Sequence, residues 1–104
     1  MKIKRIKDLK VNSYNFTVKW DINLDSGYGS ISYPKHEIII GIKNSPESEI
    51  FETVCHELME LCSIEMHVRF ARADCAGDYI FVYDHRQHDT MMNMFAGLVS
   101  QFIK

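Results

Sequence analysis

The chain has 104 residues, of which 46% are hydrophobic and 25% are charged, a composition typical of ordinary globular proteins. This length predicts a single domain that spans residues 1–104 and has a modest core. The formal net charge of −2 gives no general signal for binding to nucleic acid or to a membrane. No apolar run approaches the roughly 18 residues that a membrane-spanning helix needs.

The charges are unevenly distributed along the chain. Five of the first ten residues are basic, whereas six glutamates and no Lys or Arg lie between Lys43 and Arg69. The basic start can contact an acidic partner or can simply be solvated. It lacks the apolar segment of a secretory signal. An odd number of cysteines without such a signal favours a reducing compartment, the cytoplasm, and structural thiols at all three positions: Cys55, Cys62 and Cys75.

The first half of the chain predicts strands. Residues Tyr14–Trp20 alternate apolar and polar side chains, as a half-buried strand does. Asp25-Ser26-Gly27 indicates a turn, and Gly29–Tyr33 is a weaker strand candidate. Residues Glu37–Ile42 contain a run that is apolar on both faces, which favours a central strand or one covered on both sides.

The second half predicts two helices joined by a short strand. Ser45 as a cap and Pro46 at the first helical position start a helix that runs to about Val68 or Arg69. Residues 73–78 predict a loop, 79–83 an aromatic strand and 85–102 the last helix. The change from period two to helical periodicity and back predicts a single α+β domain with two main helices and a small sheet.

Residues 56–60 read His-Glu-Leu-Met-Glu, one substitution from the zinc-peptidase motif H-E-x-x-H. In that motif two histidines one helical turn apart bind zinc, and the glutamate activates a water. At 100° per residue, His56 and Glu60 lie about 40° apart on one helix face. A carboxylate can also bind zinc, so both are candidate metal ligands and Glu57 is the candidate base. Alternatively, the stripe is the solvent face of an amphipathic helix, shared with Glu49, Glu52, Ser63 and His67.

The last helix offers candidates for a third ligand. Helical projection places His85 and His88 on its inward face, at the N-terminal end. Three protein ligands plus water are the pattern of catalytic zinc, and Asp84 or Asp89 could orient such a histidine. Alternatively, these histidines satisfy helix-end groups or face solvent. The other two histidines have no comparable context and are predicted to be structural or exposed: His36 and His67.

The order of these elements, over about residues 28–104, resembles the small zincin-like metallopeptidase domains, including those often encoded by phages and prophages. The strand Glu37–Ile42 precedes a helix that begins at Ser-Pro and carries Cys-His-Glu-Leu-Met-Glu-Leu, and a later helix follows. The resemblance implies a small mixed sheet on which the motif helix and the C-terminal helix pack, a zinc cofactor and a peptide or protein substrate. It implies His56 as ligand, Glu57 as general base, Glu60 in place of the usual second histidine, and a third ligand at His85 or His88.

Three functions are consistent with these features. The first is a zinc-dependent peptidase in which Tyr79 or Tyr83 donates to the oxyanion. The second is a non-enzymatic zincin-like protein with a degenerate, structural or regulatory site, because a carboxylate ligand makes the metal a poorer Lewis acid. The third is a partner-binding adaptor that uses Met and aromatic residues of the last helix, although such residues are also typical of a core: Met91, Met92, Met94, Phe95 and Phe102.

Overall fold

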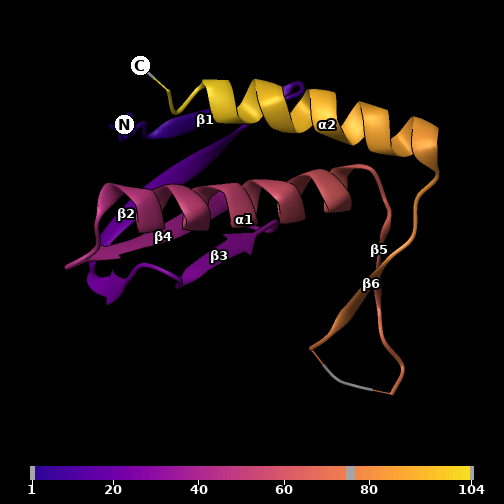
Figure 1. Ribbon diagram of the computed structural model, residues 1–104, viewed down its shortest axis with the longest axis horizontal. Helices are drawn as coiled ribbons and strands as arrows, with labels where there is room; N and C mark the ends of the chain where they lie inside the picture. The colour runs from indigo at the N-terminus through magenta and orange to yellow at the C-terminus, as the bar shows by residue number, and fades with distance from the viewer. Residues whose placement is uncertain (1, 75–76, 104) are drawn as a thin grey trace.

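A computed structural model describes residues 2–74 and 77–103, and within these it contains two helices, a four-stranded sheet and a two-stranded sheet (Figure 1). This confirms the predicted α+β class and mixed sheet. Neither helix in the described part of the chain is long and apolar enough to cross a membrane. In chain order the elements are β1 (Asp8–Val11), β2 (Tyr14–Asp25), β3 (Gly29–Ser32), β4 (Glu37–Lys43), α1 (Glu47–Glu65), β5 (Arg69–Ala71), β6 (Tyr79–Phe81) and α2 (His85–Ser100).

The main sheet has the strand order β1-β2-β4-β3. Strand β4 runs parallel to β2 and antiparallel to β3, with Ile38 opposite Val18 on one side and Ile31 on the other. The central position predicted from its apolar run is therefore confirmed. Gly41 in β4 allows a close approach of the chain, because a Cβ there would lie 2.1 Å from the Asp25 carbonyl oxygen.

Helix α1 packs on one face of this sheet, and α2 lies beside α1 and against β1 (Figure 1). The core forms where Phe16 and Ile40 of the sheet meet Leu58 and Leu61 of α1, with Phe102 closing it after α2. Full burial of one such side chain contributes about 1.5–3 kcal/mol. This packing fixes the register of α1, so Glu49, Glu52 and His56 of its polar stripe are exposed, whereas Ser63 is buried.

The two ends of α1 differ from the prediction. Ser45 does not cap the helix, because its hydroxyl donates to the Lys43 carbonyl and accepts from the Ser26 N–H; the N-cap residue is Pro46. The C-terminus falls at Glu65 rather than at Val68 or Arg69. There His67 adopts φ +57° and the Val68 N–H donates to the Ser63 carbonyl, which closes the helix and redirects the chain.

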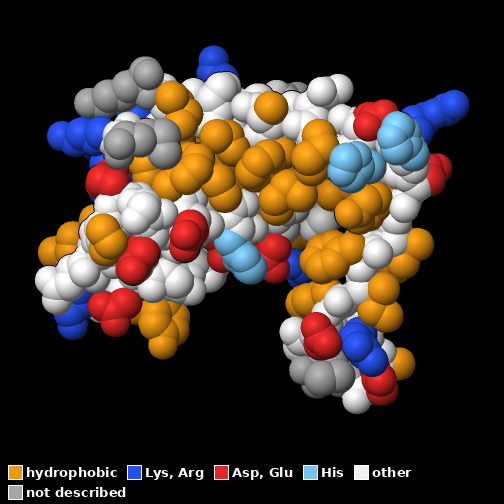
Figure 2. Space-filling view, viewed as in Figure 1, with side chains coloured by type: hydrophobic (Ala, Val, Ile, Leu, Met, Phe, Trp, Pro, Cys, Tyr) orange, Lys and Arg blue, Asp and Glu red, His pale blue; other side chains and the backbone are white. Residues whose placement is uncertain are grey.

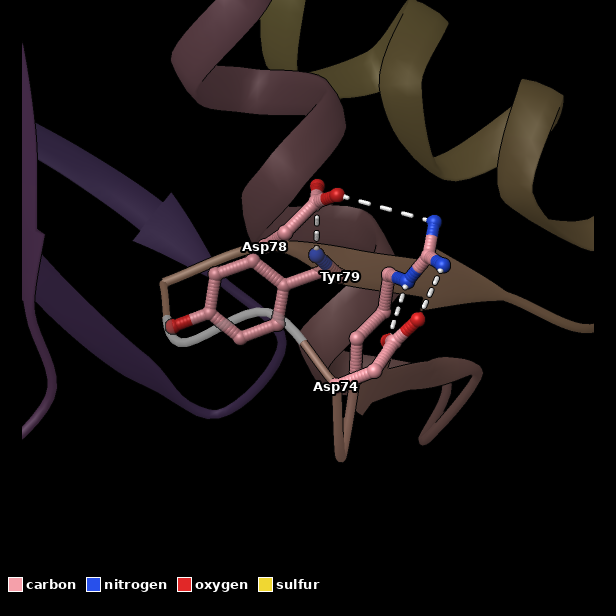
Figure 3. Close-up of polar contacts among 4 residues, drawn as sticks. Asp74, Asp78 and Tyr79 are labelled. Atoms are coloured by element: carbon pink, nitrogen blue, oxygen red, sulfur yellow. Dashed lines mark hydrogen bonds and ion pairs between the residues drawn. The ribbon is translucent and has the colours of Figure 1, made fainter.

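Strands β5 and β6 form a hairpin that leaves the body of the protein at the end of α1 and projects away from the main sheet (Figure 1). Strand β5 was not predicted, and neither was β1; each has only three or four residues. Near the tip of the hairpin, Arg72 lies between the carboxylates of Asp74 and Asp78 (Figure 3). Cys75, predicted to be a structural thiol, lies outside the described residues.

Candidate metal centre

The polar stripe of α1 brings three donor side chains together. Ligand atoms of His56, Glu57 and Glu60 all lie within 4.8 Å of one another. The His56 Nε2 and Glu60 Oε2 atoms are 3.3 Å apart. Bonds of about 2.0–2.2 Å to a tetrahedral zinc place neighbouring donors about 3.4 Å apart. The pair predicted to bind zinc therefore already has the spacing of two zinc ligands.

Glu57 is the buried member of this cluster, with 4% of its surface exposed. Its carboxyl packs against Gly29 of β3, where a Cβ would lie 2.6 Å from the Glu57 Oε1 atom, so a larger residue there would force the Glu57 side chain to shift. Burial, followed by the nearby Glu60 carboxylate, raises the pKa of Glu57 to about 7, and His56 and Arg69 oppose this rise. A carboxyl with this pKa can both accept and release a proton near neutral pH.

Arg69, which the sequence analysis did not assign to the site, is the partner of Glu60. Its Nη1 atom lies 3.5 Å from Glu60 Oε1, and its guanidinium stacks 3.8 Å above the Tyr79 ring. The Oε1 atom of Glu60 thus faces Arg69, and its Oε2 atom faces His56. Such a contact orients a metal-binding carboxylate. One signal was available in the sequence: Arg69 ends the stretch without basic residues that begins after Lys43.

The two histidines of α2 are not part of the cluster. The side chains of His85 and His88 are 91% and 46% exposed and lie 3.5 and 3.7 Å from Asp89. Their predicted inward orientation is wrong, because the N-terminal end of α2 extends past the end of α1 (Figure 1), and His88 stacks on Tyr83 there. Asp84 caps α2 by accepting a hydrogen bond from the Gln87 N–H, while Asp89 contacts both histidines. Within the described residues, the donor cluster is therefore His56, Glu57 and Glu60.

The remaining candidate residues have structural surroundings. His36 stacks on the Phe16 ring and lies tilted against the Tyr14 ring, and His67 closes α1. Tyr79 supports Arg69, and Tyr83 stacks on His88.

Both described cysteines are free thiols on α1. Burial raises the pKa of Cys55, and burial together with Glu65 raises the pKa of Cys62 to about 11. A metal binds the thiolate, and these shifts favour the thiol. The two cysteines therefore stay protonated at neutral pH, as structural thiols do.

Two clefts meet at the cluster. The acidic cleft, about 490 Å³, opens toward β3 and the turn before it; it is lined by Ser26, Gly27, Gly29, Glu49, Glu52, Thr53, His56, Glu57 and Glu60. The apolar cleft, about 540 Å³, opens toward the hairpin and α2; it is lined by Glu52, Cys55, His56, Met59, Glu60, Ser63, Phe81, Tyr83 and Met91. Figure 2 shows the corresponding notch between the body and the hairpin, with acidic and histidine side chains beside a broad hydrophobic band. Glu52, His56 and Glu60 line both clefts.

The fold and the cluster define an α+β protein with a candidate metal centre on its longer helix. No family model, curated protein or solved structure matches the chain. What the site does is therefore inferred from its own geometry.

Proposed function

We propose that this protein is a zincin-like, metal-binding domain that holds one zinc ion at His56 and Glu60, with Glu57 beside it. The observation that carries the proposal is the 3.3 Å separation of the His56 and Glu60 donor atoms. Imidazole and carboxylate are both common zinc ligands. The exposed imidazole and the cleft on each side leave this centre open to a further ligand, and the free thiols of Cys55 and Cys62 suit a reducing compartment such as the cytoplasm.

The chemistry that suits this centre is hydrolysis of a peptide bond. A zinc ion bound there would supply Lewis-acid chemistry. Glu57 accepts a proton from the attacking water and passes it to the leaving amine, because its carboxyl lies beside the two proposed ligands. Arg69 holds Glu60 in position and offsets part of its charge. We expect weak activity, because Glu60 adds negative charge where H-E-x-x-H has a neutral ligand.

A non-enzymatic metal site is the second candidate, and the exposure of His85 and His88 favours it. Without a third ligand from α2, the centre has fewer protein ligands than the usual catalytic zinc site. Such a site would be structural, regulatory or degenerate. The adaptor function has less support, because Met91 and Phe102 are buried and Met94 and Phe95 pack against the core.

Metal binding is tested on protein purified without an affinity tag. Elemental analysis and zinc titration should give one zinc per chain for the wild type. His56→Ala should lose it, whereas the matched control His88→Ala, which removes an exposed imidazole outside the cluster, should keep it. Zinc should also raise the melting temperature of the wild type, since it binds only the folded state. Equal zinc content in both variants, or none in the wild type, would contradict the proposed centre.

Catalysis is tested separately on a broad peptide mixture with and without chelator. Glu57→Gln should keep the zinc and lose hydrolysis, because an amide cannot accept the proton. Hydrolysis that survives both this substitution and the chelator would exclude the proposed mechanism. A zinc-loaded wild type that cleaves nothing would favour the non-enzymatic alternative.

A further inference from the structure

The apolar cleft has the size and lining of a side-chain pocket. Its volume of about 540 Å³ lies in the usual range for ligand pockets. Three elements build it: α1 provides Met59, α2 provides Met91, and the hairpin and the segment after it provide Phe81 and Tyr83. The polar members of the lining, including His56, stand along one wall. The cleft therefore suits a large apolar side chain of a peptide whose backbone lies beside the metal centre.

The hairpin leaves its side of this cleft exposed. Phe81 and Tyr83 are about half-exposed, as are several neighbouring large hydrophobic residues of the hairpin. Exposed apolar groups that cluster in this way mark interaction surfaces. Phe81 pairs with Arg69 across the hairpin, and Arg69 reaches Glu60. These contacts fix the position of Phe81 relative to the candidate metal centre. An apolar side chain that enters the cleft would cover the exposed Phe81 ring.

The acidic cleft has the opposite character. Four carboxylates line it, from Glu49, Glu52, Glu57 and Glu60. Ser26 donates to Glu49, and Arg69 pairs with Glu60. Glu52 is exposed and lines both clefts. A zinc ion at His56 and Glu60 would leave the charge of Glu52 and Glu49 available, so this cleft favours a cationic group and repels phosphate.

We infer that the two clefts are the halves of one peptide-binding groove, which selects a segment in which a large apolar residue stands next to Lys or Arg. The apolar cleft lies on the α2 and hairpin side of the shared residue His56, and the acidic cleft lies on the β3 side. Successive side chains of an extended peptide point to opposite sides. Neighbouring apolar and basic residues can therefore enter the two clefts while their shared backbone crosses the metal centre. This inference rests on the proposed function and names its substrate class.

The test measures binding of fluorescein-labelled hexapeptides to the zinc-loaded full chain by anisotropy, with mass spectrometry to check that the peptides stay intact. The probes are Gly-Gly-Phe-Lys-Gly-Gly, its Lys-Phe counterpart, and versions with Phe replaced by Ser or Lys replaced by Gln. One of the two Phe/Lys orders should bind at least about ten-fold more tightly than its Ser-replaced version, since burial of a Phe ring alone is worth more than that factor. It should also bind more tightly than its Gln-replaced version, because Gln has no charge to pair with Glu49 and Glu52. Equal affinity for all peptides, or tighter binding of a labelled oligonucleotide, would overturn the inference.

Matched variants locate the effect in the clefts. Phe81→Ser should abolish the preference for Phe, whereas Ile80→Ser should keep it, because Ile80 is exposed to nearly the same degree but points to the other side of β6. Glu52→Gln should abolish the preference for Lys, and Asp8→Asn on β1, away from both clefts, should not. Equal loss in Phe81→Ser and Ile80→Ser would overturn the apolar pocket.

Zinc content measured on the same samples separates this inference from the proposed function. Stoichiometric zinc without peptide preference overturns the groove alone. Selective peptide binding without any zinc supports the groove and contradicts the metal centre.

Discussion

The body of the protein and the β5–β6 hairpin use large hydrophobic residues in opposite ways. In the body, Phe16 and Leu61 are completely buried, whereas Phe70 of the hairpin is 51% exposed. A two-stranded hairpin alone is marginally stable in water. The difference teaches that the body supplies the stability of the fold, while the hydrophobic side chains of the hairpin remain available for contacts outside the core.

The candidate centre lies at the border between these regions. The packed helix α1 supplies the donor atoms of His56, Glu57 and Glu60, and the hairpin supplies Arg69 and the wall at Phe81. Donors on a packed helix are held more rigidly than groups on an exposed hairpin. This division places the proposed ligands on the packed helix α1 and leaves the Phe81 wall of the apolar cleft on the exposed hairpin.

The largest expected effect separates the two regions by stability. Phe16→Ala should lower the free energy of unfolding by about 3–5 kcal/mol, because it leaves a cavity in a filled core. Phe70→Ala in the hairpin should change it by no more than about 0.5 kcal/mol, as exposed substitutions usually do. Urea denaturation measures both. Similar losses would show that the hairpin belongs to the same cooperative core.

The next effect concerns the pH dependence of the body, measured in metal-free protein. The pKa of Glu57 is raised to about 7, so the folded state holds a proton that the unfolded state releases near pH 4.5. Stability contributed by this proton is complete below pH 4.5 and is lost as the pH rises to about 7, a decrease of the order of 2 kcal/mol. Thermal melts in chelator should show this decline in the wild type and a smaller one in Glu57→Gln. Parallel pH profiles of the melting temperature in the wild type and Glu57→Gln would contradict this role of the Glu57 proton.

A smaller effect is expected at the far end of α1, where Glu65 accepts hydrogen bonds from Tyr14, Tyr33 and Asn12. Tyr14→Phe should destabilise the protein by about 1–2 kcal/mol, because a partly buried carboxylate loses one donor. Burial and Glu65 raise the pKa of Tyr14 to about 12. The stability that depends on its proton is therefore lost between about pH 10 and 12. Urea titrations at pH 8 and 11 measure the loss in Tyr14→Phe and the pH dependence of the wild type. An unchanged midpoint in Tyr14→Phe would show that its hydroxyl does not stabilise Glu65.

The smallest effect is expected at the hairpin tip. Arg72 donates from Nε and Nη2 to Asp74 at 3.0 and 2.8 Å and lies 3.8 Å from Asp78 (Figure 3). Exposed ion pairs are screened by water and salt and contribute little. Arg72→Ala should leave the urea midpoint almost unchanged, and hydrogen exchange of the β4 amides should stay slow. A clear shift of the midpoint would mean that the tip supports the body.

The sequence alone determined the features that depend on neighbouring residues. Alternating side chains predicted β2, a run apolar on both faces predicted β4, aromatic residues predicted β6, and helical periodicity predicted both helices, because each of these patterns is local in the sequence. The His-Glu-x-x-Glu spacing placed the donors of His56 and Glu60 on one face, because helical geometry is local.

Only the tertiary structure decided how distant parts meet. Strand β1 pairs with β2, and β5 pairs with β6. Arg69 contacts Glu60, and the two clefts form between different elements. Each of these features joins segments that a loop separates in the sequence. The apolar projection of α2 included His85 and His88, but the helix extends beyond its partner there, so the same face points into solvent. Periodicity indicates on which side of its helix a side chain lies. Whether another element covers that side depends on how the chain packs.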